Sequence, residues 1–123
     1  MGRRRNPVFA PRERDIQASL LEYWRVLGVA GSLVAACPNA HSHGQAGLTP
    51  GLFDLVVLSP KLGDRTGWLE LKRSDGKLST AQNTFRLMLI ALGAPYTVAY
   101  GIDQAIRALE EWGAVRPQAR AAA

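Results

Sequence analysis

Two short apolar segments, each interrupted by a single carboxylate, decide the fold: Leu52-Phe53-Asp54-Leu55-Val56-Val57-Leu58 and Trp68-Leu69-Glu70-Leu71-Lys72. Runs of apolar and β-branched residues of this length are typical of buried strands, and the residues between them, Ser59 to Gly67, are rich in turn formers. We therefore expect strands at Leu52–Leu58 and Thr66–Lys72, paired as an antiparallel hairpin.

Working outward from this hairpin, apolar residues at helical or strand spacing predict five more elements. Helices are expected at Pro11–Leu27, Leu78–Leu92 and Asp103–Trp112, and strands at Ser32–Cys37 and Tyr96–Tyr100. In the second helix we expect one packed side, made of Phe85, Met88, Leu89 and Leu92. The resulting order, α-β-β-β-α-β-α, predicts an α/β domain with a mixed sheet flanked by helices.

The length and charge of the chain restrict both its organisation and its partners. With 123 residues, 47% of them apolar, the chain suits one domain, which we place at residues 11–113, between a disordered basic tail at 1–10 and a frayed tail at 114–123. The net charge of +5 favours binding to a polyanion such as DNA. We expect no membrane segment, and the single cysteine, Cys37, fits a cytoplasmic protein without an intramolecular disulfide.

The two carboxylates predict a metal site. An ionised Asp54 or Glu70 in an apolar strand costs several kcal/mol unless a cation or hydrogen bonds compensate it. If the hairpin pairs these strands, Asp54 and Glu70 can converge and bind Mg²⁺, with the Leu71 carbonyl and water completing the shell. Lys72 lies on the same face as Glu70 and could stabilise charge on a phosphate. A solvent-facing Asp54 and a surface Glu70–Lys72 pair would explain the same spacing, which leaves both interpretations open.

A longer motif favours the first interpretation. Gly51-Leu52-Phe53-Asp54-Leu55, then Trp68-Leu69-Glu70-Leu71-Lys72, then Gly76-Lys77-Leu78-Ser79-Thr80-Ala81-Gln82 resembles the signature of the virus-type replication-repair nuclease (VRR-NUC) domain of the PD-(D/E)XK superfamily. The resemblance implies a restriction-endonuclease-like core and a divalent metal, Mg²⁺ with Mn²⁺ as a substitute, held by Asp54 and Glu70. It also implies that Lys72 is the catalytic lysine. Phe53 departs from the pattern, because the family commonly has proline before this aspartate.

Two further residues match the family pattern and also have a structural explanation. Gln82 would support the site, although Ser79-x-x-Gln82 is also a capping box for the helix that follows. Glu13 would lie near the metal, although an acidic residue in the first turn of a helix is also favoured by the helix dipole. For contacts with nucleic acid we consider Arg73, Lys77, Asn39 and His43, and we expect His41, beside His43, to be solvated.

The resemblance also implies a substrate. Stand-alone members of the family suggest a phage or bacterial homodimer that cuts branched DNA such as Holliday junctions, because two symmetric cuts need two sites. Flaps, nicks or duplex ends are alternative substrates. A non-catalytic DNA-binding module of a phage replication or recombination assembly is the rival from another class, followed by a protein-interaction domain of a phage or plasmid replication assembly.

Overall fold

Four strands form one mixed sheet in the computed structural model, which describes residues 10–38 and 46–118. They are β1 (Leu33–Ala36), β2 (Leu55–Leu58), β3 (Gly67–Lys72) and β4 (Tyr96–Tyr100), and they lie in the order β1-β2-β3-β4. β2 is antiparallel to both β1 and β3, whereas β4 is parallel to β3. The expected β2–β3 hairpin is confirmed.

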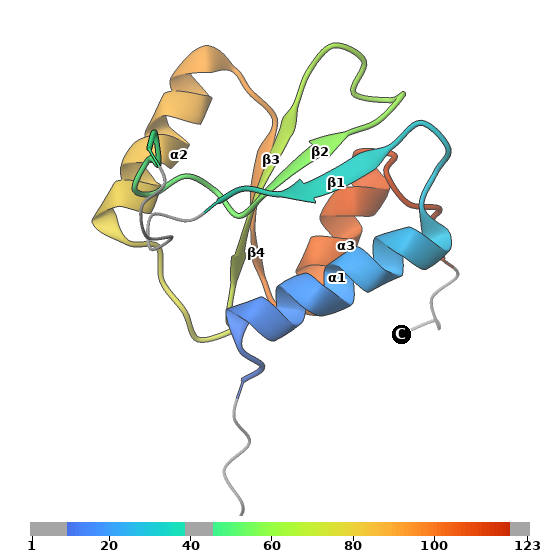
Figure 1. Cartoon of the computed structure of the whole chain (residues 1–123), viewed down its shortest axis with the longest axis horizontal. Helices are drawn as coiled ribbons and strands as arrows, with labels where there is room; N and C mark the ends of the chain where they lie inside the picture. Colours follow the sequence, from blue (N-terminus) through green and yellow to red (C-terminus); the bar gives the residue numbers. More distant parts are fainter. Residues whose placement is uncertain (1–9, 39–45, 119–123) are drawn as a thin grey trace, which may run out of the picture.

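Helices cover both faces of this sheet. Figure 1 shows α1 (Glu13–Leu27) and α3 (Ile102–Glu111) together on one face and α2 (Thr80–Leu92) on the other. α2 lies in the connection between the parallel strands β3 and β4, which cannot be joined by a tight turn. The predicted order α-β-β-β-α-β-α and the predicted α/β class are therefore confirmed.

Side chains alternate between the two faces of β3 and so enter two different packed layers. Leu69 and Leu71 lie in the main core with residues of β2, α1 and α3, among them Leu55, Val57, Ile16, Leu20 and Leu109. Trp68 belongs to an aromatic layer against α2, in which its ring is 5.3 Å from that of Phe85, and Phe85 is 5.2 Å from Phe53. The period-two pattern expected for this strand is present, and Trp68 is a packing residue.

The strand predicted at Leu52–Leu58 begins only at Leu55, which corrects its N-terminal boundary. The ladder to β3 ends at the pair of Leu55 and Leu69. Beyond this pair, the Leu71 N–H donates to the Asp54 side chain instead of to a backbone carbonyl. On the other side, the Cys37 N–H still donates to the Asp54 carbonyl, at 2.7 Å. Asp54 therefore lies at the point where β2 separates from β3.

The predicted packed side of α2 is wrong for two of its four residues. Met88 is 54% exposed and Leu92 is 75% exposed, whereas Leu89 is only 3% exposed and Phe85 is half-buried. The buried strip of α2 is narrow, so Met88, one position before Leu89, and Leu92, three positions after it, both face solvent.

The segment after Gly113 does not fray as predicted, at least through residue 118. Ala114 and Val115 are fully buried, Val115 forms an isolated bridge with Gly28, and the Arg116 N–H donates to the Leu27 carbonyl. Gly113, at φ 70°, turns the chain back toward the end of α1, where its backbone finds hydrogen-bond partners. The basic tail at 1–9 and residues 119–123 lie outside the described residues. Within the described part, no helix is long and apolar enough to cross a bilayer.

Candidate active site

Asp54 and Glu70 lie opposite each other where β2 and β3 separate. Extending the register of Leu55 with Leu69 by one residue pairs Asp54 with Glu70. The Asp54 N–H donates to Glu70 Oε1 at 3.1 Å, and the Leu71 N–H donates to Asp54 Oδ2 at 2.9 Å. Each carboxylate thus accepts a backbone hydrogen from the other strand. The side chains replace the missing ladder bonds and are held in fixed positions by them.

Lys72 adds an ammonium to this pair of carboxylates, and α1 adds a third acid. Lys72 Nζ is 3.7 Å from Glu70 Oε2 and 3.8 Å from Glu13 Oε2. Glu70 is fully buried and Lys72 nearly so, whereas Glu13 is partly exposed at the first turn of α1. The structure therefore brings together three predicted residues, Asp54, Glu70 and Lys72, and places Glu13 beside the ammonium.

Gln82 makes contacts of two kinds, one set at the start of α2 and one with Glu70. Its backbone N–H donates to Ser79 Oγ at 3.1 Å, and its Oε1 accepts the Ser79 N–H at 2.8 Å, which completes the capping box. The other end of the same amide, Nε2, donates to Glu70 Oε2 at 2.8 Å. Gln82 therefore couples the start of α2 to the position of the buried carboxylate.

Gly51 has a positioning role that the sequence interpretation did not assign to it. At φ 85° its backbone lies so close to α2 that an added Cβ would be 2.3 Å from the Ala81 carbonyl oxygen and 2.8 Å from the Gln82 nitrogen. Only glycine permits this approach. The signal in the sequence was a glycine three residues before Asp54, but its contact is made by a helix about thirty residues away. Phe53, the residue before Asp54, is fully buried and packs against Phe85.

Burial makes the ionised carboxylates unfavourable in the absence of a cation. Burial and then the negative charge of Asp54 raise the pKa of Glu70 from 4.5 to about 8, and the Lys72 ammonium opposes this rise. The pKa of Asp54 is also raised, first by burial and then by the charge of Glu13, against the hydrogen bond from Leu71. Three carboxyl groups thus lie near one ammonium. When all three are ionised, the site has an excess of negative charge that a bound cation would offset.

The carboxylate oxygens of Asp54 and Glu70 are donor atoms that suit a hard divalent cation. Within residues 10–38 and 46–118, no group of three or more His, Cys, Asp or Glu side chains is arranged to hold a metal by itself. Mg²⁺ needs no such group, since it is commonly bound through one or two carboxylates and completes its octahedron with water and substrate phosphates. Asp54 and Glu70 provide this sparse set of oxygens, and each carboxylate oxygen that accepts one hydrogen bond retains a second lone pair.

The remaining predicted nucleic-acid contacts differ in their availability. Arg73 forms an ion pair with Asp75, with Nε 3.2 Å from Oδ1, so its guanidinium already has a partner. Lys77 is exposed next to α2. Asn39 and His43, and His41 beside it, lie outside the described residues.

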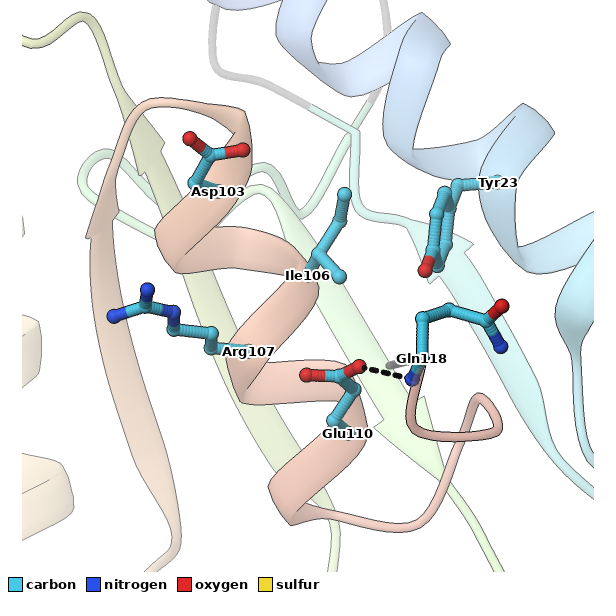
Figure 2. A pocket seen from close by; sticks show the side chains of 6 residues that line it. All are labelled: Tyr23, Asp103, Ile106, Arg107, Glu110 and Gln118. Carbon is cyan, nitrogen blue, oxygen red and sulfur yellow. Dashed lines mark hydrogen bonds between the residues drawn. The ribbon is translucent and has the colours of Figure 1, made fainter. Parts of the chain in front are cut away.

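A cavity lies away from the carboxylates, between α1, α3 and the segment after α3. Figure 2 shows its lining, and its volume is about 330 Å³. Glu110 accepts a hydrogen bond from the Gln118 N–H at 3.1 Å. Among the described residues, the lining has two carboxylates, Asp103 and Glu110, and one cation, Arg107, so its charge does not favour a phosphate.

Comparison with known proteins supports the architecture. No family model matches the chain, and no curated protein matches it. A solved structure described as a "VRR_NUC domain protein" is similar with a TM-score of 0.70 and 20% identity, over 85% of this chain and 90% of that one. A second, described as "VRR_NUC domain", has a TM-score of 0.58 and 22% identity, over 80% of this chain and 94% of that one. The chain therefore has the fold of these VRR_NUC domain structures.

Proposed function

We propose that this protein is a VRR-NUC nuclease that hydrolyses phosphodiester bonds in DNA with the help of a divalent metal. The observation that supports this most directly is the arrangement of Asp54, Glu70 and Lys72 at the point where β2 and β3 separate. The buried Glu70 and the half-buried Asp54, both with raised pKa values, and the adjacent buried Lys72 ammonium destabilise a fold unless they serve a function. The fold shared with VRR_NUC domain structures is the second support.

Each side chain has a specific task in this proposal. Asp54, Glu70 and the Leu71 carbonyl would hold Mg²⁺, or Mn²⁺ in its place, which when bound polarises the phosphate and makes water a better nucleophile. Lys72 orients the attacking water or stabilises negative charge on the phosphate from its position 3.7 Å from Glu70. Gln82 positions Glu70 through its amide, and Glu13 positions the Lys72 ammonium.

The substrate we propose is branched DNA such as a Holliday junction, cut by a homodimer. A symmetric junction needs two cuts, and a two-fold dimer presents two sites in the matching arrangement. The positive charge of the chain supports binding to the phosphate backbone. Such substrates would place the protein in the cytoplasm of a bacterial or phage-infected cell.

A cleavage assay on junction, flap, nicked and blunt duplex substrates tests this proposal. The wild type should cut in Mg²⁺ or Mn²⁺ and not in EDTA, and Asp54→Ala and Lys72→Ala should each lose at least about a hundredfold in rate. Asp64→Ala and Lys61→Ala are matched controls, because both residues are exposed in the turn between β2 and β3. Circular dichroism of each variant verifies folding. Cutting by Asp54→Ala at the wild-type rate would refute the site.

The same substrates separate the rival functions. A non-catalytic DNA-binding module would bind DNA with a steep salt dependence and cut nothing in any metal. A protein-interaction domain would bind none of the substrates at low salt, and the positive charge of the chain would then be incidental.

A further inference from the structure

A groove lies between α2 and the edge strand β4, next to the carboxylates. Its volume is about 460 Å³, and we call it the tyrosine groove; its lining includes Lys77, Asn83, Arg86, Tyr96, Val98 and Tyr100. β4 runs beside β3 (Figure 1), and the register pairs Val98 with Glu70 and Tyr100 with Lys72. Paired residues of neighbouring strands project to the same face, about 4.8 Å apart across the ladder. The floor of the groove therefore continues the row formed by Glu70 and Lys72.

One wall of the groove is α2, which also contributes to the site. Asn83 directly follows Gln82, whose amide holds Glu70. Asn83 Oδ1 accepts a hydrogen bond from Arg86 Nε at 3.0 Å, which orients the guanidinium along this wall. Arg86 and Lys77 give the groove two positive charges, and no acidic residue lines it within the part of the chain that the structure describes. Guanidinium and ammonium groups in this setting favour phosphate oxygens.

The floor of the groove contains two tyrosine rings, which lie near these cations. Tyr96 is braced by Phe53, with ring centroids 6.4 Å apart, while Tyr100 is 37% exposed at the end of β4. The Tyr100 backbone is fixed by a hydrogen bond from its N–H to Gln104 Oε1, at 2.9 Å. Tyrosine beside arginine is the combination that binds single-stranded nucleic acid, because a base stacks on the ring while the cation contacts the phosphate.

The geometry distinguishes an unpaired nucleotide from a base pair. In a duplex the bases are stacked on one another and offer only their edges in the grooves, so their faces are not available to a tyrosine. The volume of the groove is in the range of small-molecule pockets, which suits a nucleotide and is too small for a duplex.

We propose that the tyrosine groove binds an unpaired nucleotide of the DNA substrate beside the phosphate that is cut. Its base would lie against Tyr100, and its phosphate would contact Arg86 and Lys77. This inference rests on the proposed nuclease chemistry and narrows its substrate, because it favours a flap, in which a single-stranded segment adjoins the cut, over a fully paired four-way junction.

Binding measurements without metal test the groove separately from catalysis. Fluorescence anisotropy in EDTA would compare a blunt duplex with the same duplex carrying an oligo(dT) overhang, for wild type, Tyr100→Ala, Tyr100→Phe and Arg86→Ala. Tyr100→Ala should weaken binding of the overhang substrate about tenfold and leave the blunt duplex unchanged, while Tyr100→Phe, which keeps the ring, should bind within about twofold of wild type. Arg86→Ala should weaken the overhang substrate more than Arg107→Ala, which removes the same charge from the other cavity.

Each outcome separates this proposal from the nuclease proposal. Equal binding of both substrates by the wild type would overturn the proposed binding of an unpaired nucleotide in the groove, even if the wild type cuts DNA. Equal losses of affinity for both substrates in Tyr100→Ala would overturn it as well. Selective loss of overhang binding in Tyr100→Ala, with binding retained in Tyr100→Phe, would support nucleotide binding in the groove even if the protein does not cut DNA with any metal. The same selective loss with an oligo(U) overhang would show that the groove accepts any single strand. Thermal unfolding of each variant verifies that the substitutions leave the fold intact.

Discussion

Without a divalent cation, the stability of this protein should fall as the pH rises from about 4.5 to about 8. Burial and the neighbouring Asp54 charge raise the pKa of Glu70 from 4.5 to about 8 in the folded protein. Between these values the folded protein retains a proton that the unfolded chain has released, so unfolding releases a proton and becomes more favourable at higher pH. Asp54, whose pKa is also raised, contributes in the same direction.

The size of the effect follows from the same shift. Each pKa unit corresponds to about 1.4 kcal/mol, so the full loss attributable to Glu70 is on the order of 5 kcal/mol once the pH exceeds about 8. Typical domains are stable by only about 5 to 15 kcal/mol. The metal-free protein should therefore be markedly destabilised at pH 9, and a bound cation should restore stability there by favouring the ionised carboxylates.

Urea unfolding in EDTA at a series of pH values from 5 to 9, repeated with saturating Mg²⁺, measures this effect. Glu70→Gln is the matched variant, because its neutral side chain keeps an oxygen for the Asp54 N–H and does not titrate. Its stability should depend less on pH in this range, and Mg²⁺ should stabilise it less than the wild type. Parallel pH profiles for the two proteins in EDTA, or equal stabilisation of both by Mg²⁺, would refute this reasoning.

Three further substitutions test the surroundings of the site. Gly51→Ala should lower both stability and cleavage rate, since its Cβ would be 2.3 Å from the Ala81 carbonyl oxygen; unchanged melting and activity would contradict this. Ser79→Ala should cost about 1 kcal/mol by urea unfolding, because it removes the acceptor for the α2 N-cap hydrogen bond, and a cost near zero would show that the box does not stabilise the helix. Leu92→Lys should change stability by less than about 0.5 kcal/mol because Leu92 is exposed, whereas Leu89→Lys should unfold the protein; equal effects on thermal unfolding would contradict the observed orientation of α2.

Local sequence was enough for the elements and their order. The alternation in Trp68 to Lys72 places leucines in the main core and Trp68 in the layer against α2, and the apolar segment before it pairs with it as expected. These features depend on side-chain period and on turn residues, which are properties of neighbouring positions. The acidic residues were also identifiable, because a carboxylate in an apolar strand is conspicuous.

Boundaries and exposure were less predictable. Residues 114–118 looked like a polar and alanine-rich tail, yet Ala114 and Val115 are buried because the end of α1 offers backbone partners that the local sequence does not indicate. Met88 and Leu92 fit a helical apolar stripe, but the width of the surface that α2 covers depends on Phe53 and Trp68, against which Phe85 of α2 packs.

The chain by itself therefore determined which residues form strands and helices and which carboxylates stand in apolar surroundings, because these are set by interactions between near neighbours. Only the tertiary structure decided that Asp54 ends its strand by binding the Leu71 N–H, that Gln82 reaches Glu70 and that Glu13 lies beside Lys72. Those contacts join α1, the β2–β3 hairpin and α2, and their geometry depends on how the packed layers set the distance between elements remote in sequence.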